Sequence, residues 1–119
     1  MEPVPEKPME NFEARIVGIS GEGLTREVTA ELSNKMAEDV HNAVVKLQVT
    51  SGNSVIKPNG QPYLEVDLGT IKSGEAVKST IKVSLGFFDG LKITQNGAVL
   101  HLTVKSDEVT ETVKYEYKP

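Results

Sequence analysis

Apolar and polar residues alternate along most of the chain, which is the pattern of strands that bury one face and expose the other. In the segment LTREVTAELSN, Val28, Ala30 and Leu32 share one face, opposite charged and hydroxyl residues. The same period of two recurs in six further segments, residues 12–20, 41–50, 63–69, 75–85, 98–105 and 109–117. In the first of them the inward face is open between Ile16 and the pair Val17 and Ile19. No segment shows a convincing helical period. Seven short strands with turn signals between them predict an all-β fold, a seven-stranded β-sandwich.

The last two segments predict a hairpin, because a polar turn at residues 106–108 separates them. The apolar faces of the seven strands together predict the core. Its expected members are Ile16, Val28, Leu32, Val45, Leu47, Val66, Leu68, Ile71, Ile81, Val83, Leu100, Leu102 and Val113.

Residues 1–10 differ in composition from the rest of the chain. Pro3, Pro5 and Pro8 occur together with four charged residues in this stretch, which is typical of extended linkers. We therefore expect a proline-rich acidic linker or disordered tail over residues 1–10 and one β-sandwich domain over residues 11–118. The alternative is an ordered segment that caps an edge of the sandwich, since proline is tolerated at sheet edges. A chain of 119 residues supports a single hydrophobic core.

The stretch LGTIKSG, residues 68–74, places an isoleucine between two glycines just before a new strand. A chain that passes from one sheet of a sandwich to the other crosses the open end of the core, and an apolar side chain must close that end against water. We expect Ile71 to fill this role. Gly69 and Gly74 are the expected turn positions, because a positive φ is costly for residues that carry a Cβ atom.

The stretch VDLGTIKSGEAVKSTIKVSL, preceded by REVTAELSNKMAEDVHNAVVKLQVTSG, resembles the immunoglobulin-like sandwiches repeated in archaeal and bacterial surface proteins. These include cell-adhesion-related domains and S-layer-associated modules. Such modules typically show a strand that ends in Asn, a second Asn at the next strand start, and a Leu-Gly-x-Leu/Ile-x-x-Gly-Glu crossing. The matching residues are Asn34, Asn42, Leu68, Gly69, Ile71, Gly74 and Glu75.

This resemblance covers residues 24–85 and implies an immunoglobulin-like or fibronectin III-like β-sandwich. Similar crossings occur in fibronectin type III domains and in clathrin-adaptor appendage sandwiches. The resemblance also implies a module of a larger protein that is extracellular or located at the cell surface. A fold alone does not define a function, so the function implied here rests on analogy.

The composition excludes several classes of function. The formal charge of −4 and the absence of a basic stripe argue against a nucleic-acid partner. No apolar run approaches the roughly 18 residues of a membrane helix, so direct membrane insertion is not expected. The chain has no cysteine, which excludes disulfides, thiolate zinc sites and cysteine nucleophiles. The first residues lack the pattern of a secretory signal, so we expect any export signal to lie outside this chain.

No group of residues predicts catalysis, a cofactor or a metal ion. His41 follows two acidic residues in a stretch that we expect to be a solvated loop, where Asn42 caps backbone groups. His101 is expected on the polar face of its strand, exposed or in a cross-strand hydrogen bond. Asp107 and Glu108 could form a calcium site at one end of the sandwich, together with Glu75 and Asp89. They lack the spacing of a dedicated calcium loop, so ordinary turn chemistry is the expectation.

The possible partner contacts are aromatic. Phe87 and Phe88 precede Asp89 and Gly90, which read as a turn. In one interpretation, one ring fills the core and the other covers the sandwich edge. In the other, the rings are exposed and contact a partner. Tyr115 and Tyr117, on one face of the last strand, raise the same question; these four residues are the candidate contacts.

The sequence leaves three functional hypotheses. The favoured one is a non-catalytic spacer or adhesion module, monomeric in isolation, that contacts other proteins or neighbouring domains of its own polypeptide. The second is a carbohydrate-binding or docking domain attached to an enzyme, which would use Tyr63, Tyr115 or Tyr117. It is disfavoured because the chain has no tryptophan and six aromatic residues. The third is a stand-alone sandwich that binds a peptide at an edge strand, either strand 109–117 or the first strand.

Overall fold

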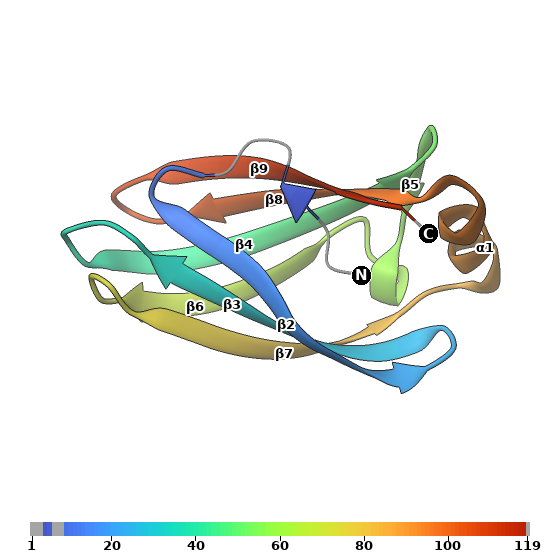
Figure 1. Ribbon diagram of the computed structural model, residues 1–119, viewed down its shortest axis with the longest axis horizontal. Helices are drawn as coiled ribbons and strands as arrows, with labels where there is room; N and C mark the ends of the chain where they lie inside the picture. The colour runs from blue at the N-terminus through green and yellow to red at the C-terminus, as the bar shows by residue number, and fades with distance from the viewer. Residues whose placement is uncertain (1–3, 6–8, 119) are drawn as a thin grey trace.

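The computed structural model describes residues 4–5 and 9–118, and in Figure 1 two layers of strands lie face to face. The described residues form nine strands: β1 (Val4–Pro5), β2 (Phe12–Glu22), β3 (Thr25–Asn34), β4 (Val40–Ser51), β5 (Ser54–Ile56), β6 (Leu64–Ile71), β7 (Ala76–Ser84), β8 (Ala98–Lys105) and β9 (Thr110–Tyr117). The prediction of an all-β, two-sheet sandwich is confirmed. The count of seven is not confirmed, because two short strands, β1 and β5, accompany seven strands of at least eight residues.

All neighbouring strands are antiparallel. One sheet has the order β1-β9-β8-β4-β5, and β6 also pairs with β4; the other sheet has the order β2-β3-β7. One edge of β4 serves two partners, because β6 pairs with residues 40–47 and β5 pairs with residues 49–51. The predicted hairpin of the last two strands is confirmed, since β8 and β9 pair from Lys105 and Thr110 outward.

The predicted linker, residues 1–10, lies partly outside the described residues, which include only positions 4, 5, 9 and 10 of it. Val4 and Pro5 form β1 and pair with Glu116 and Tyr115 at the edge of β9. Met9 is buried in the main hydrophobic cluster. The described part of this segment therefore contacts the sandwich at both its edge and its core.

The crossing between the two sheets connects β6 to β7. Gly69 and Gly74 have φ angles of 68° and 75°, in the left-handed region that favours glycine. Ile71 ends β6 with no exposed surface and pairs with Val40, which is equally buried. An apolar side chain thus closes this end of the core.

A helix, α1 (Phe87–Asn96), precedes β8. The expectation of a turn at Asp89 and Gly90 is wrong, and so is the expectation that the chain contains no helix. Tertiary contacts hold this helix: the Ser51 hydroxyl donates to the carbonyls of Lys92 and Gly97, at 3.1 and 2.6 Å. Gly97 follows with a φ of 73°, and its N–H donates to the Ile93 carbonyl, which ends the helix. A single turn of 3₁₀ helix, η1 (Pro58–Gly60), lies between β5 and β6.

Two hydrophobic clusters hold the layers. The larger cluster contains Met9, Phe12, Leu32, Val40, Ala43, Ile71, Leu102, Val104 and Val113. The smaller cluster contains Val49, Ile56 and Ala98, with Leu85 and Ile93 packed against it. Four predicted core residues, Leu32, Ile71, Leu102 and Val113, are buried. Others, including Ile16, Val28, Val66, Ile81 and Leu100, are only half-buried, because they line a cleft between the sheets.

Candidate functional site

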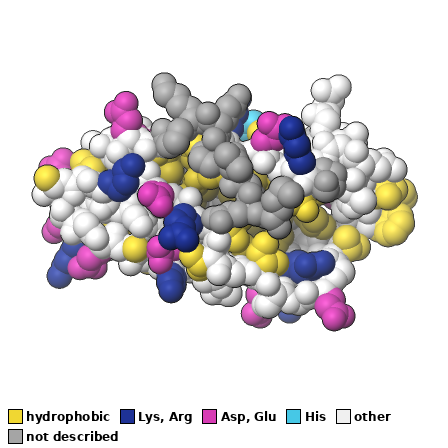
Figure 2. Space-filling model, in the orientation of Figure 1, with side chains coloured by type: hydrophobic (Ala, Val, Ile, Leu, Met, Phe, Trp, Pro, Cys, Tyr) yellow, Lys and Arg dark blue, Asp and Glu magenta, His cyan; other side chains and the backbone are white. Residues whose placement is uncertain are grey.

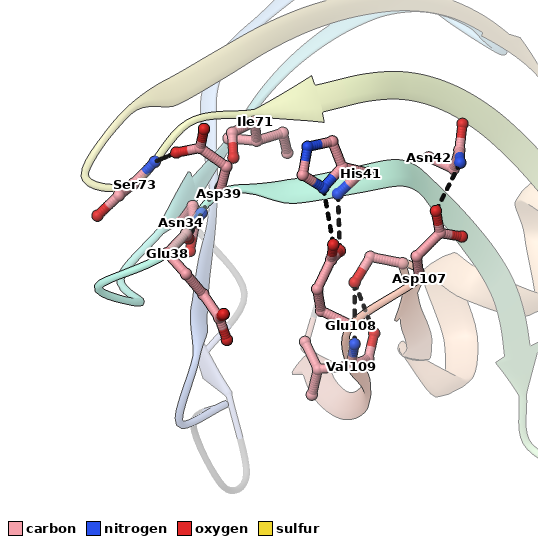
Figure 3. A network of polar contacts seen from close by, with 11 residues as sticks. Asn34, Glu38, Asp39, His41, Asn42, Ile71, Ser73, Asp107, Glu108 and Val109 are labelled. Carbon is pink, nitrogen blue, oxygen red and sulfur yellow. Dashed lines mark hydrogen bonds and ion pairs between the residues drawn. The ribbon is translucent and has the colours of Figure 1, made fainter.

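The beginning of β4 and the β8–β9 turn are joined by an ion pair. His41 Nδ1 lies 2.7 Å from Glu108 Oε2, and the backbone N–H of His41 donates to Glu108 Oε1 at 2.7 Å (Figure 3). The hydrogen bond and charge of Glu108 raise the pKa of His41 above its ordinary value of 6.5. The same hydrogen bond lowers the pKa of Glu108 below 4.5. Because both side chains face solvent, the pair is a surface link between the beginning of β4 and the β8–β9 turn.

Asn42 and Asp107 make a second link beside the first. Asn42 Nδ2 donates to Asp107 Oδ2 at 2.7 Å, and the Asp107 N–H donates to the His41 carbonyl at 2.9 Å (Figure 3). Two expectations need correction here. His41 belongs to β4 instead of a loop, and the Asn42 side chain bonds a carboxylate instead of local backbone groups. Asn42 also has a φ of 54°, a conformation that asparagine tolerates better than most residues.

Asn34, at the end of β3, is a buried polar residue whose structural role the sequence did not reveal. Its side chain is 1% exposed. Nδ2 donates to the carbonyls of Glu38 and Ile71 at 2.9 and 3.0 Å, and Oδ1 accepts from the Met36 N–H at 2.9 Å. The side chain therefore ties the β3–β4 loop to the crossing at Ile71. Nearby, Asp39 Oδ1 accepts from the N–H of Ser73 at 2.9 Å (Figure 3).

The candidate calcium ligands do not come together. Asp107 and Glu108 lie at the β8–β9 turn, whereas Asp89 lies on α1 at the opposite end of the sandwich (Figure 1). There, Asp89 Oδ2 accepts from the backbone N–H of Lys57 at 3.0 Å. Among residues 4–5 and 9–118, no three acidic or histidine side chains are grouped so as to hold a metal ion. His101 makes the expected cross-strand contact, with Nε2 3.1 Å from the Thr50 hydroxyl.

The most exposed large apolar side chains lie at the α1 end. Phe87 and Phe88 are 68% and 73% exposed, and their rings pack edge to face with centroids 5.6 Å apart. Leu91, on the same helix, and Leu24, in the β2–β3 turn, are also exposed. We call these four residues the α1 patch; hydrophobic side chains at this end are visible on the right of Figure 2. The interpretation that one phenylalanine fills the core is wrong.

The α1 patch joins two segments that are far apart in sequence. A Cβ atom on Gly90 would collide with the Leu24 side chain, so the absence of a side chain at position 90 lets the helix approach the β2–β3 turn. The N–H of Leu85 donates to the Leu24 carbonyl at 2.9 Å, just before the helix. The patch is therefore a composite surface that the tertiary structure assembles.

The candidate tyrosines are less accessible than the phenylalanines. Tyr115 is half-buried, and its hydroxyl donates to the Ala14 carbonyl at 3.3 Å; burial raises the pKa of this phenol. Tyr117 packs against the smaller cluster. Tyr63 is 40% exposed, with Lys46 Nζ 3.9 Å from its ring centroid. These three residues do not form an exposed platform of the kind a sugar ring stacks on.

The sheet edges are unequal as sites for an added peptide strand. The last strand, β9, is paired with β1 at its C-terminal end. In the other sheet, β2 and β7 are the edges. An irregularity in the β2 register lies between Ile16 and Gly18, and bulges of this kind disfavour the addition of a further strand.

A sequence profile for the family described as archaeal immunoglobulin-like domain matches residues 13–118. A solved DUF3823 family protein from Bacteroides ovatus is similar, with 16% identity and a TM-score of 0.46 over 92% of this chain. The match covers 53% of that protein, so the chain spans about half its length. A protein from Archaeoglobus fulgidus gives the same identity, TM-score and coverage of this chain, with 96% of its own length covered. A search of curated proteins finds no match.

Proposed function

The chain belongs to the archaeal immunoglobulin-like domain family, and from this premise we propose that it is a non-catalytic interaction module of a larger cell-surface protein, acting as a spacer or adhesion unit. The family match accords with the resemblance seen in the sequence and with a structural or interaction role. Within the described residues, no helix has the length and apolarity needed to cross a membrane.

The α1 patch is the observation that carries the proposal. Two phenylalanines at the beginning of a surface helix contribute little to the core when they are 68% and 73% exposed. Together they leave roughly 250 Å² of aromatic surface in water, taking about 180 Å² for a whole phenylalanine side chain. The largest apolar patch on a monomeric protein is typically about 300–600 Å² and is often functional, and the two rings together with Leu91 and Leu24 form a contiguous patch of this kind.

The size of the patch indicates what kind of contact it makes. A stable complex between free proteins buries about 800 Å² on each partner, several times the area of the two rings. A smaller contact suffices when the partner is tethered in the same polypeptide, because tethering raises the effective concentration to the millimolar range. Tyr117, near the end of the described chain, pairs with Ala98 directly after α1. A domain that follows this one would therefore begin near the C-terminal end of α1, the helix that carries three of the four patch residues.

The experiment is a cross-linking measurement in cells that express the native polypeptide. A photo-reactive phenylalanine analogue replaces Phe88. In the matched control it replaces the exposed Lys105, at the end of β8 that is distant from α1. We expect adducts from position 88 with a neighbouring domain or a second surface protein, and protease treatment of intact cells should remove the labelled polypeptide. A protease-protected band of 12.9 kDa without adducts would contradict both the surface location and the patch.

A further inference from the structure

A cleft with a volume of about 160 Å³ lies between the two sheets. Its lining includes residues from β2, β3 and β7 in one layer and from β4, β6, β8 and β9 in the other. Figure 2 shows hydrophobic side chains in the middle of this face of the molecule. The cleft is therefore part of the sandwich interior that the two hydrophobic clusters leave unfilled.

Small side chains at three inward positions account for the empty space. Ala30, in the middle of β3, pairs with Ser79 on β7, and Ala14 contributes from β2. Ala30 faces the opposite sheet, in phase with Val28 and Leu32, and is nevertheless exposed. Packed interiors rarely contain voids larger than a water molecule, so an open space of this size is unusual in a domain of this length.

The lining is almost entirely hydrocarbon. Arg15 and Glu31 border the cleft, but the alternation of their strands turns both side chains to the outer face. The hydroxyl of Tyr115 is already directed to the Ala14 carbonyl. Ser79 contributes one further hydroxyl to the lining. A polar or charged molecule would lose its hydration here and regain few hydrogen bonds, whereas an enclosed apolar cavity of about 150 Å³ stays dry and binds benzene.

The shape of the cleft favours a linear occupant. Three alternate positions line it on β6, Leu64, Val66 and Leu68. Three more line it on β7, from Val77 to Ile81. On each strand the first and last of these positions are four residues apart, a distance of about 13 Å along the strand. A space of that length and small volume is narrow, so it matches one extended chain better than a compact ring.

We propose that the cleft between the sheets binds the alkyl chain of a free single-chain amphiphile, with the head group left in solvent. The small volume admits one chain, which excludes a lipid with two. The site is separate from the α1 patch, and its occupant needs no cell-surface partner. It is a second binding function of the same domain.

The test uses the 119-residue protein with sodium alkanoates from hexanoate to dodecanoate, below their micelle concentrations. Isothermal titration calorimetry should show binding of one molecule per protein. Affinity should rise about fourfold with each added methylene, the effect of burying one CH₂ group, until the chain outgrows the cleft. Decanol and decyltrimethylammonium should bind similarly to decanoate, because none of the described residues that line the cleft turns a charged side chain into it. Affinity that is independent of chain length would overturn the proposal.

Variants locate the site. Ala30→Leu places a larger side chain inside the cleft and should weaken decanoate binding by more than about tenfold. Ala76→Leu makes the same change on the outer face of β7 and should leave binding unchanged. Ser79→Leu fills the cleft from the neighbouring strand, β7. It replaces Ala30→Leu in this test if that variant does not fold. Equal binding by the parent and the folded cleft-filled variant would overturn the proposal.

Two further measurements distinguish binding in the cleft from binding at the α1 patch and from binding to a membrane surface. Phe88→Ser should leave decanoate binding unchanged; a loss there, with Ala30→Leu unaffected, would place the ligand on the α1 patch and overturn the assignment. Phosphatidylcholine vesicles should not sediment the protein. Vesicle binding without saturable binding of the single-chain probes would identify a membrane surface as the ligand and would also overturn it.

Discussion

Replacing Asn34 by alanine removes three hydrogen bonds at a position that is 1% exposed. The lost bonds join the side chain to the carbonyls of Glu38 and Ile71 and to the N–H of Met36. Each contributes about 1 kcal/mol net, and the buried Ile71 carbonyl also loses its side-chain donor without gaining water. We therefore expect Asn34→Ala to lower the free energy of unfolding by about 3 kcal/mol.

The assay is urea unfolding followed by circular dichroism. A domain of 119 residues has a stability of about 6–18 kcal/mol, so the variant should still fold. With a urea dependence of about 2 kcal/mol per molar, the midpoint should fall by about 1.5 M. Asn53→Ala is the matched control, because Asn53 is an exposed turn residue. A change for Asn34→Ala no larger than that of the control would refute the assigned role of this side chain.

The charge of the replacement supplies a further check. Asn34→Asp keeps an oxygen that can accept from the Met36 N–H, but an ionised carboxylate cannot donate to the Ile71 carbonyl. A buried, unpaired charge is also costly. This variant should be less stable than Asn34→Ala at pH 7 and should recover as the pH falls, because the protonated acid regains a donor. An Asn34→Asp variant with the same midpoint as the parent at neutral pH would contradict the donor role.

The other predictions concern the surface ion pair, one glycine and the helix. The pKa of His41 is raised, so its contribution to stability is present below pH 6.5 and lost as the pH rises through the folded value. The pKa of Glu108 is lowered, so its contribution is present above pH 4.5 and lost as the pH falls through the folded value. An NMR titration should show the pKa of His41 above 6.5 and a return toward it in Glu108→Gln; an unchanged titration would disprove the pairing. Gly74→Ala should destabilise the protein by about 1 kcal/mol in thermal unfolding, because φ is positive there, whereas Gly18→Ala should be near neutral. Ser51→Ala should increase amide exchange in α1, because it removes the hydroxyl that bonds the carbonyls of Lys92 and Gly97, and unchanged exchange there would count against this anchor.

The fold class followed from local patterns. A period of two in the apolar residues is a property of each strand by itself, so the seven long strands and the final hairpin could be predicted without knowledge of their partners. The crossing between the sheets could also be predicted, because an isoleucine between glycines combines an apolar side chain with two positions suited to positive φ. The same residues carried the resemblance to immunoglobulin-like modules, which the family match bears out.

The helix and the candidate contacts depended on tertiary structure. Gly90 costs a helix about 1 kcal/mol relative to alanine, and the dipeptide at residues 89–90 reads locally as a turn. Ser51, distant in sequence, holds the helix through hydrogen bonds to the carbonyl of Lys92, within it, and to that of Gly97, directly after it. Likewise, the partnership of His41 with Glu108 spans 67 positions of the chain, and no pattern within either segment predicts it.

Alternation determined which residues face inward, but it could not determine how closely the two sheets approach. Val28 and Ile81 face inward as predicted, yet they line a cleft instead of a filled core. Their burial depends on the volume of every side chain opposite, including the small Ala30. That volume is a property of both layers together, so only the tertiary structure decides where the core is solid and where it is open.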